Sequence, residues 1–104
     1  MSDFPEVELA SAWYDVAGPV GAKPIVLVHG STVTRKSWQP QIEALSGEYR
    51  LVAIDLPGHG VLAGEPFHFD GAVEIVRQAV DREAGGGAML VGMSLGGCVA
   101  ILFA

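Results

Sequence analysis

The sequence predicts an α/β domain built on a three-layer, mostly parallel sheet. Three short and continuously apolar segments, at residues 25–28, 51–54 and 88–91, each end at a histidine, an aspartate or a glycine. Continuous apolar runs of this length are typical of strands that a sheet buries on both faces. Helix-compatible segments separate the three runs. The order strand, helix, strand, helix, strand indicates right-handed βαβ units.

The composition favours a folded domain over a disordered tail. The chain has 104 residues, of which half are apolar and 17% are charged. A disordered segment would be rich in charge and poor in apolar side chains. The length corresponds to one small domain or to part of a larger one.

The first expected element, residues 7–15, is longer and more mixed in polarity than the three apolar runs. Trp13 and Tyr14 stand near its end, and Gly18 and Pro19 follow it. Mixed polarity between turn residues is typical of a strand with one exposed face. We therefore predict one outer strand, antiparallel to its neighbour.

Two helices are expected between the buried strands. Ser37 is the predicted N-cap of a helix over residues 38–45, with Pro40 in the first turn, where its missing N–H is tolerated. Asp70 is the predicted cap of a longer helix over residues 71–84, in which valines recur at helical spacing. A run of three glycines follows and ends it.

The last segment, residues 95–104, predicts a helix that is apolar on every side. Such a helix is normally buried all round by covering elements. The sequence stops inside it, without a cap, a charge or a closing glycine. We therefore expect residues 1–104 to be a single partial domain that lacks later strands.

Charge and composition exclude several classes of partner. Six Lys and Arg against twelve Asp and Glu leave a net charge of −6, so no basic surface is expected for nucleic acid.

Cys98 is the single cysteine and is predicted to be a small buried apolar residue. No His, Cys or Asp cluster has metal-ligand spacing. Residues 1–6 lack the features of a signal peptide, and the longest apolar run, residues 98–104, is shorter than the ~18 residues of a membrane span. A cytoplasmic chain that does not bind membranes is expected.

The turn between the last strand and the last helix carries the clearest chemical motif. Residues 92–96 read Gly-Met-Ser-Leu-Gly and match G-x-S-x-G, the nucleophile-elbow motif. At such a turn the serine takes a strained backbone conformation, and the glycines let neighbouring chains approach closely. The hydroxyl of Ser94 would then project at a helix N-terminus, whose free N–H groups stabilise negative charge. The position after a buried strand and before a helix is the context that this motif requires.

Two further motifs make the chain resemble the α/β-hydrolase family. Residues 28–31, Val-His-Gly-Ser, are similar to the oxyanion loop after the family's third strand. Residues 55–60, Asp-Leu-Pro-Gly-His-Gly, match the D-x-P-G-x-G loop after the fourth strand, although Val61 replaces the serine that usually follows. Trp38 stands where many members carry a tryptophan. The motifs come in the family's order, so the resemblance implies a sheet of the α/β-hydrolase type, truncated after the nucleophile elbow.

The resemblance also implies roles for individual residues. Ser94 would be the nucleophile, and the backbone N–H groups of Leu95 and Ser31 would form the oxyanion hole. A serine at the elbow resembles the esterase, thioesterase and lactonase members, whereas dehalogenases and epoxide hydrolases use aspartate there. The implied substrate is a small ester-type molecule, and no cofactor is implied.

The acid and the base of the family's catalytic triad have no counterpart after the nucleophile. Members follow the order Ser, Asp or Glu, then His, and no Asp, Glu or His follows Ser94 in this sequence. An alternative is a self-contained triad of His29, Asp55 and Ser94, since triads are defined by geometry. The resemblance favours loop-shaping roles for both upstream residues. His59 and His68 are interpreted as loop and packing residues.

Two functions follow as hypotheses. The favoured one is a serine hydrolase represented by its N-terminal part, which is inactive alone because a serine without a base is a poor nucleophile. The other is a non-catalytic remnant or a scaffold module that pairs with a second chain. An edge strand beside an uncovered apolar helix would promote self-association, or binding of a complementing C-terminal chain.

Overall fold

The structure, a computed structural model, describes residues 7–11 and 13–104. Residues 1–6 and Ala12 lie outside the described residues, so the cytoplasmic location argued from residues 1–6 stays a prediction. Within the described part of the chain, no helix combines the length and the apolar composition needed to cross a membrane.

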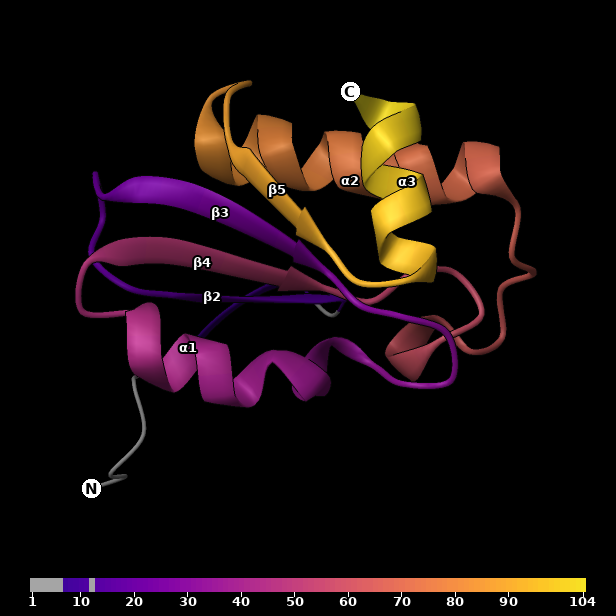
Figure 1. The fold of residues 1–104 in the computed structure, drawn as a ribbon, viewed down its shortest axis with the longest axis horizontal. Coiled ribbons are helices and arrows are strands. Elements are labelled where there is room, and N and C mark those ends of the chain that lie inside the picture. Colours follow the sequence, from indigo (N-terminus) through magenta and orange to yellow (C-terminus); the bar gives the residue numbers. More distant parts are fainter. Residues whose placement is uncertain (1–6, 12) are drawn as a thin grey trace.

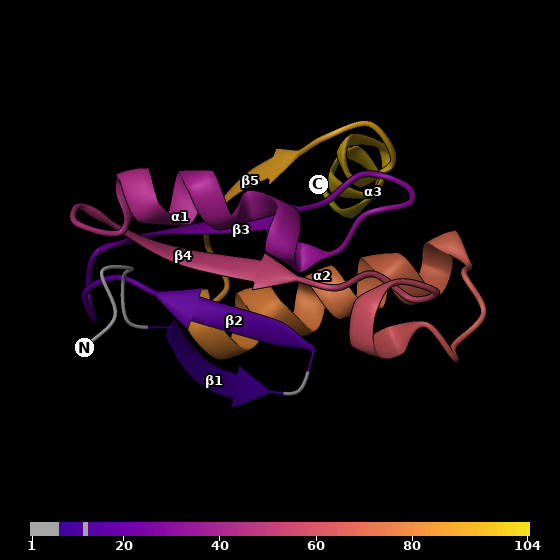
Figure 2. The same ribbon diagram turned by 90° about the horizontal axis from the view of Figure 1, so that it is seen from below.

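A five-stranded sheet in the order β1-β2-β4-β3-β5 forms the middle of the molecule, as Figure 2 shows. Strand β3 pairs in parallel with both β4 and β5, whereas β2 is antiparallel to β1 and to β4. The strands are β1 (Val7–Ser11), β2 (Tyr14–Ala17), β3 (Lys23–Val28), β4 (Tyr49–Ile54) and β5 (Met89–Gly92). The three predicted apolar strands therefore form the parallel part, and two antiparallel strands extend it.

Helices cover both faces of this sheet and give the predicted three layers (Figure 1). Helix α1 (Gln39–Leu45) lies on one face, after a 3-10 turn, η1 (Arg35–Trp38). Helices α2 (Phe69–Ala84) and α3 (Leu95–Phe103) lie on the other face. A second 3-10 turn, η2 (Gly60–Leu62), lies between β4 and α2.

The prediction of one outer strand over residues 7–15 is wrong. The chain reverses, so that β1 and β2 form an antiparallel pair whose register ends at Ser11 opposite Tyr14. All four residues of β2 are buried, because β2 lies between β1 and β4. The segment of mixed polarity is thus divided between two short strands.

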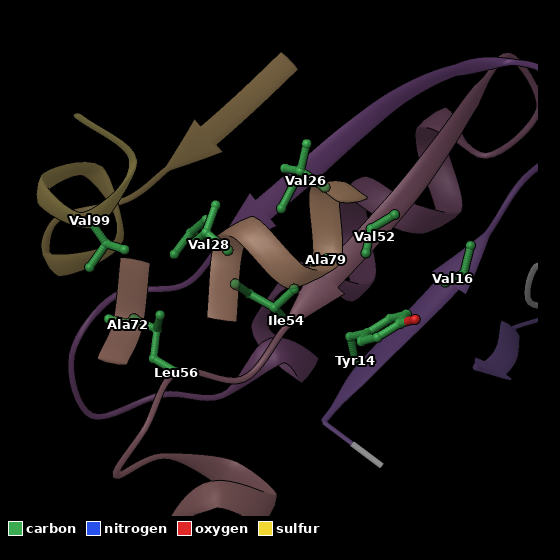
Figure 3. Packing of buried hydrophobic residues seen from close by; sticks show 12 residues of the cluster. Tyr14, Val16, Val26, Val28, Val52, Ile54, Leu56, Ala72, Ala79 and Val99 are labelled. Carbon is green, nitrogen blue, oxygen red and sulfur yellow. The ribbon is translucent and has the colours of Figure 1, made fainter. Parts of the chain in front are cut away.

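The core follows the alternation of side chains along the parallel strands. Val26 and Val28 of β3 point to the α2 side, where they join Val99 of α3 (Figure 3). Ile25 and Leu27 point to the α1 side. Two apolar cores, one on each face, therefore hold the ends of β3 and β5 in place beneath the loops that follow them.

The starts of the helices differ from those predicted. Thr34 caps η1, since its Oγ1 accepts a hydrogen bond of 3.2 Å from Lys36 N–H, whereas Ser37 lies inside η1 and α1 follows Trp38 without a side-chain cap. Helix α2 begins at Phe69 with His68 as N-cap and no side-chain cap, so Asp70 lies in its first turn. Local sequence allows several polar residues to cap, and the tertiary position of the preceding loop selects among them.

The elements at the β5 side of the sheet are more exposed than the apolar sequence predicts. Met89 of β5 is 62% exposed, and Ile101 and Leu102 of α3 are 77% and 59% exposed. The expectation that β5 is covered on both faces is therefore wrong, because Met89 and Val91 line an open hollow on the α1 face of the sheet. The prediction of a buried Cys98 is also wrong, since its side chain is exposed on the same helix.

The end of α2 provides a test of the backbone. Gly85 ends α2 with a φ of 61°, in the left-handed region, whereas Gly87 has no such conformation and both positions have open space for a methyl group. We expect Gly85→Ala to lower the free energy of unfolding by about 1 kcal/mol. Gly87→Ala is the matched control and should change it little. Urea unfolding of both variants measures the difference, and equal effects would contradict the assignment.

Candidate active site

Ser94 stands on a sharp turn at the carboxyl end of β5. Its backbone has φ 56° and ψ −115°, and its side chain is exposed at the N-terminus of α3. Among the described residues, Ser94 and Thr32 are the two non-glycine residues with positive φ. Such a sparsely populated conformation costs a residue with a side chain about 1–3 kcal/mol. The elbow predicted from residues 92–96 therefore has the expected strained geometry.

The turn is closed by glycines that let three backbone segments meet. A methyl group at Gly92 would overlap the carbonyl of Gly96, and one at Gly96 would overlap the carbonyl of Val28. The N–H of Met93 donates a hydrogen bond of 3.1 Å to that same Val28 carbonyl. The first turn of α3 thus lies directly against the end of β3.

The loop after β3, residues 29–34, lies beside the serine and is called the oxyanion loop below. A methyl carbon built on Gly30 would stand 3.6 Å from Cβ of Ser94. Ser31, the next residue, is exposed, and Leu95 is half-buried in the first turn of α3. Neither Ser31 N–H nor Leu95 N–H donates a hydrogen bond to a described residue. Both predicted oxyanion donors are therefore free, in segments that border Ser94.

No described residue acts as a base for Ser94. Its hydroxyl makes no hydrogen bond within residues 7–11 and 13–104. His29, the predicted alternative, is fully buried with both ring nitrogens engaged: Nε2 accepts from Leu56 N–H at 3.0 Å, and Nδ1 lies 2.7 Å from the Gly30 carbonyl. Because Nε2 accepts, the proton sits on Nδ1 and is donated to Gly30. His29 therefore links two loops and has no free nitrogen for Ser94.

The second member of the alternative triad, Asp55, is also engaged elsewhere. Asp55 is fully buried, and its Oδ1 accepts a hydrogen bond of 2.8 Å from the backbone N–H of Arg35. Its Oδ2 accepts from the guanidinium of Arg35 and, at 3.1 Å, from Val61 N–H. The self-contained triad of His29, Asp55 and Ser94 is therefore contradicted, and the loop-shaping roles are the ones observed.

Arg35 is the residue of this region that the sequence did not single out. Its Nε lies 3.0 Å from Oδ2 of Asp15 on β2, and Nζ of Lys36 lies 2.7 Å from the same oxygen. Burial alone would lower the pKa of Arg35, but the adjacent carboxylates of Asp15 and Asp55 raise it above its ordinary value. No motif links residues that are this far apart in sequence, so only the fold shows the network.

Of the two remaining histidines, His59 lies in the loop predicted for it, whereas the prediction that His68 is a packing residue is wrong. Nδ1 of His59 is 3.0 Å from the carbonyl of Pro57, and its ring centroid is 5.0 Å from that of His29. His68 is exposed at the start of α2. Neither forms a hydrogen bond with Ser94.

Comparison with known proteins identifies the family. A model described as "Alpha/beta hydrolase family" matches residues 25–104. The chain belongs to the alpha/beta hydrolase family. The match covers all three motifs by which the sequence resembles this family: the loops after β3 and β4 and the turn at Ser94.

Individual relatives include proteins named as esterases. The chain is 36% identical over 88 residues to a pimeloyl-[acyl-carrier protein] methyl ester esterase of Vibrio cholerae, covering 85% of this chain and 32% of the esterase. It is 36% identical over 91 residues to a dihydrolipoyllysine-residue acetyltransferase component of an acetoin cleaving system from Pseudomonas putida, covering 86% of this chain and 24% of that protein. The chain thus spans about a quarter to a third of these relatives.

Solved structures confirm the fold. An esterase of M. tuberculosis superposes with a TM-score of 0.71 at 28% identity, covering 99% of this chain and 37% of the esterase. Structures of this hydrolase fold that match the chain also include an epoxide hydrolase. The α/β-hydrolase class predicted from the motifs is therefore confirmed.

The environment of His29 predicts a pH dependence of stability. Burial lowers the pKa of His29 below its ordinary value, and the nearby His59 acts in the same direction. The unfolded chain takes up the proton first, so the stabilisation is present above about pH 6.5 and is lost as the pH falls. We expect this loss not to exceed about 1.4 kcal/mol per pH unit.

Unfolding in urea at pH 7.5 and 5.5 tests this dependence. His29→Gln keeps a side-chain acceptor for Leu56 N–H but does not titrate, so it should reduce the loss of stability between the two pH values. His68→Gln, at an exposed position, is the control. An unchanged loss in His29→Gln would show that another group causes it.

Proposed function

We propose that the chain carries the nucleophile and the oxyanion hole of a serine hydrolase that acts on an ester, thioester or lactone. The observation that carries the proposal is the strained turn at Ser94, which exposes a hydroxyl beside two unbonded backbone N–H groups, those of Leu95 and Ser31. Preorganised N–H donors of this kind stabilise the oxyanion of a tetrahedral intermediate, and each contributes about 2.7–4 kcal/mol to transition-state stabilisation.

The nucleophile type favours acyl transfer over epoxide opening. In the proposed reaction, the Ser94 oxygen attacks the acyl carbon, and the serine proton passes through a base to the leaving alcohol or thiol. The ester bond breaks as the new acyl ester on Ser94 forms. Water then attacks this ester, releasing the acid and restoring the hydroxyl. The esterases among the relatives support this reaction class.

The base and the acid of the proposed enzyme come from polypeptide outside this sequence. His29 and Asp55 are committed to structural contacts, and His59 and His68 make no contact with Ser94. We therefore propose that the chain is the N-terminal part of a hydrolase and does not turn over substrate alone. The identity of the acyl and alcohol groups depends on those additional segments.

Labelling of Ser94 tests the proposed function. A fluorophosphonate replaces the serine proton with a phosphonyl group and releases fluoride, and its phosphonyl oxygen occupies the oxyanion hole. We expect rapid labelling of a chimera in which residues 1–104 are followed by the later part of the V. cholerae esterase. The 104-residue chain should react at least about 100-fold more slowly, because it lacks a general base.

Mass spectrometry of peptides locates the label. Ser94→Ala in the chimera should remove it, while Ser37→Ala, at an exposed serine of η1, should leave it unchanged. A folded chimera that is not labelled, or is labelled at another residue, would contradict the proposal.

A second candidate function is that of a module that pairs with another chain. The observation that favours it is the exposed apolar surface at the β5 side, where the edge strand and Ile101 and Leu102 of α3 lack a covering element. A hollow of about 300 Å³ lies on the opposite face and is lined mainly by apolar side chains from β3, β5 and α1. Exposed surfaces of this kind favour association.

Sedimentation velocity of the 104-residue chain tests this candidate. We expect concentration-dependent association, and the double variant Ile101→Gln/Leu102→Gln should weaken it by about tenfold or more, since two buried aliphatic side chains would be lost from the interface. Val20→Gln, at a residue that is 85% exposed in the loop before β3, is the control. A monodisperse monomer at all concentrations would exclude self-association.

A further inference from the structure

A buried ion network joins the oxyanion loop to two strands of the sheet. Asp15 of β2, Arg35 of η1 and Asp55 after β4 are 5%, 7% and 0% exposed. Arg35 bridges the two carboxylates, with Nε toward Asp15 and Nη1 toward Asp55. We infer that Arg35 is a positioning residue, which acts through Asp55 to hold the oxyanion loop against Ser94. This inference rests on the proposed function of that site.

The oxyanion loop is held at both ends and strained in the middle. At its start, His29 bonds to Leu56 N–H and to the Gly30 carbonyl. At its end, the backbone and the guanidinium of Arg35 both bond to Asp55. Between these points, Thr32 has a φ of 66°, which a β-branched residue rarely adopts. A strained segment persists only where the surrounding structure holds it.

Asp55 is the centre of this arrangement because it also holds the loop after β4. Its carboxylate accepts from Val61 N–H, and a methyl group at Gly60 would overlap the carboxylate. The loops after β3 and β4 therefore close around one carboxylate. Asp55 thereby connects the loop after β4 to Arg35, the residue that directly follows the oxyanion loop.

Stability alone does not explain a network of this kind. Removing three charges from water is costly, and buried ion pairs are frequently no more stabilising than apolar residues of similar volume. The guanidinium is suited to hold geometry, because its rigid fork of donors bonds to two groups at fixed angles. A lysine at position 35 would keep the charge but could not hold both carboxylates in the same way.

Arg35→Lys is the main test, and Arg77→Lys is its matched control. Arg77 also contacts two carboxylates, those of Glu74 and Asp81, but on the exposed side of α2. In the 104-residue chain, we expect Arg35→Lys to lower the ¹⁵N order parameters of residues 31–33 from about 0.85 toward 0.6. Arg77→Lys should leave them unchanged.

Labelling by the fluorophosphonate shows whether this order matters at Ser94. In the chimera described above, Arg35→Lys should lower the maximal labelling rate by about tenfold while the concentration for half-maximal rate changes little, because the loop contributes to the tetrahedral state. Asp15→Asn is a milder second variant. It removes the charge of one of the two carboxylates that contact Arg35 and keeps the shape of the side chain. It should lower the maximal labelling rate by about threefold, and it replaces Arg35→Lys as the test variant if Arg35→Lys does not fold.

The outcomes separate the two proposals. Absence of labelling in the unsubstituted, folded chimera contradicts the serine hydrolase. Labelling that both variants leave at the unsubstituted rate contradicts the positioning role alone, as do unchanged order parameters in residues 31–33. A loss of thermal stability without any change in the maximal labelling rate would show that the network is structural only.

Discussion

The position of the candidate nucleophile depends on the contact between the first turn of α3 and the end of β3. Gly96 lies over the carbonyls of Val28 and His29, and Gly92 lies beneath Gly96. The N–H of Met93 donates to the Val28 carbonyl, so the turn is hydrogen-bonded to the neighbouring strand before the serine and packs closely against it after the serine, at Gly96. The hydroxyl of Ser94 has no hydrogen-bonding partner among the described residues. The backbone therefore sets where the hydroxyl lies.

This contact also explains why the oxyanion loop is at the site. In a parallel sheet, the carboxyl ends of neighbouring strands lie at one edge, and β3 is the neighbour of β5. The loop that leaves β3 must pass the elbow, and Gly30 allows it to pass without a side chain between it and Ser94. The loop that leaves β4 is then joined to it by His29 and Asp55. The three sequence motifs directly follow β3, β4 and β5, and they lie together because the carboxyl ends of these strands are neighbours.

The parts of the molecule that the sequence predicts are those governed by local rules. Continuous apolar runs identified β3, β4 and β5, and the motif at residues 92–96 identified a turn whose geometry follows from its own glycines. The reversal between β1 and β2 was missed, because residues 7–15 contain no glycine or proline to indicate a turn. The exposure of Cys98 was missed for a different reason. The sequence of α3 is apolar throughout, so it does not show which side of the helix other elements cover.

In the candidate site, too, the features set by local motifs were predicted and those set by long-range contacts were not. The positions of Ser94 and of the loop after β3 follow from motifs, whereas the contacts of Asp55 depend on Arg35, twenty residues earlier in the chain, and on Asp15 beyond it. An aspartate near a histidine is compatible with both a triad and an ion network, and only the pairing with Arg35 distinguishes them. Long-range ionic contacts leave no periodic pattern in a sequence.

The arrangement separates the two halves of acyl-transfer chemistry. Stabilisation of an oxyanion needs backbone N–H groups that are fixed in place, and local motifs with a close helix–strand contact are sufficient to fix them. Proton transfer needs a titratable side chain at hydrogen-bonding distance, and no described residue supplies one to Ser94. Under the proposed function, the chain would stabilise a tetrahedral adduct and still lack turnover, because a general base contributes about 10²–10⁴-fold to the rate by itself. In the proposed hydrolase, oxyanion stabilisation would thus be a property of the strand ends, whereas proton transfer would need a side chain that the described residues do not place beside Ser94.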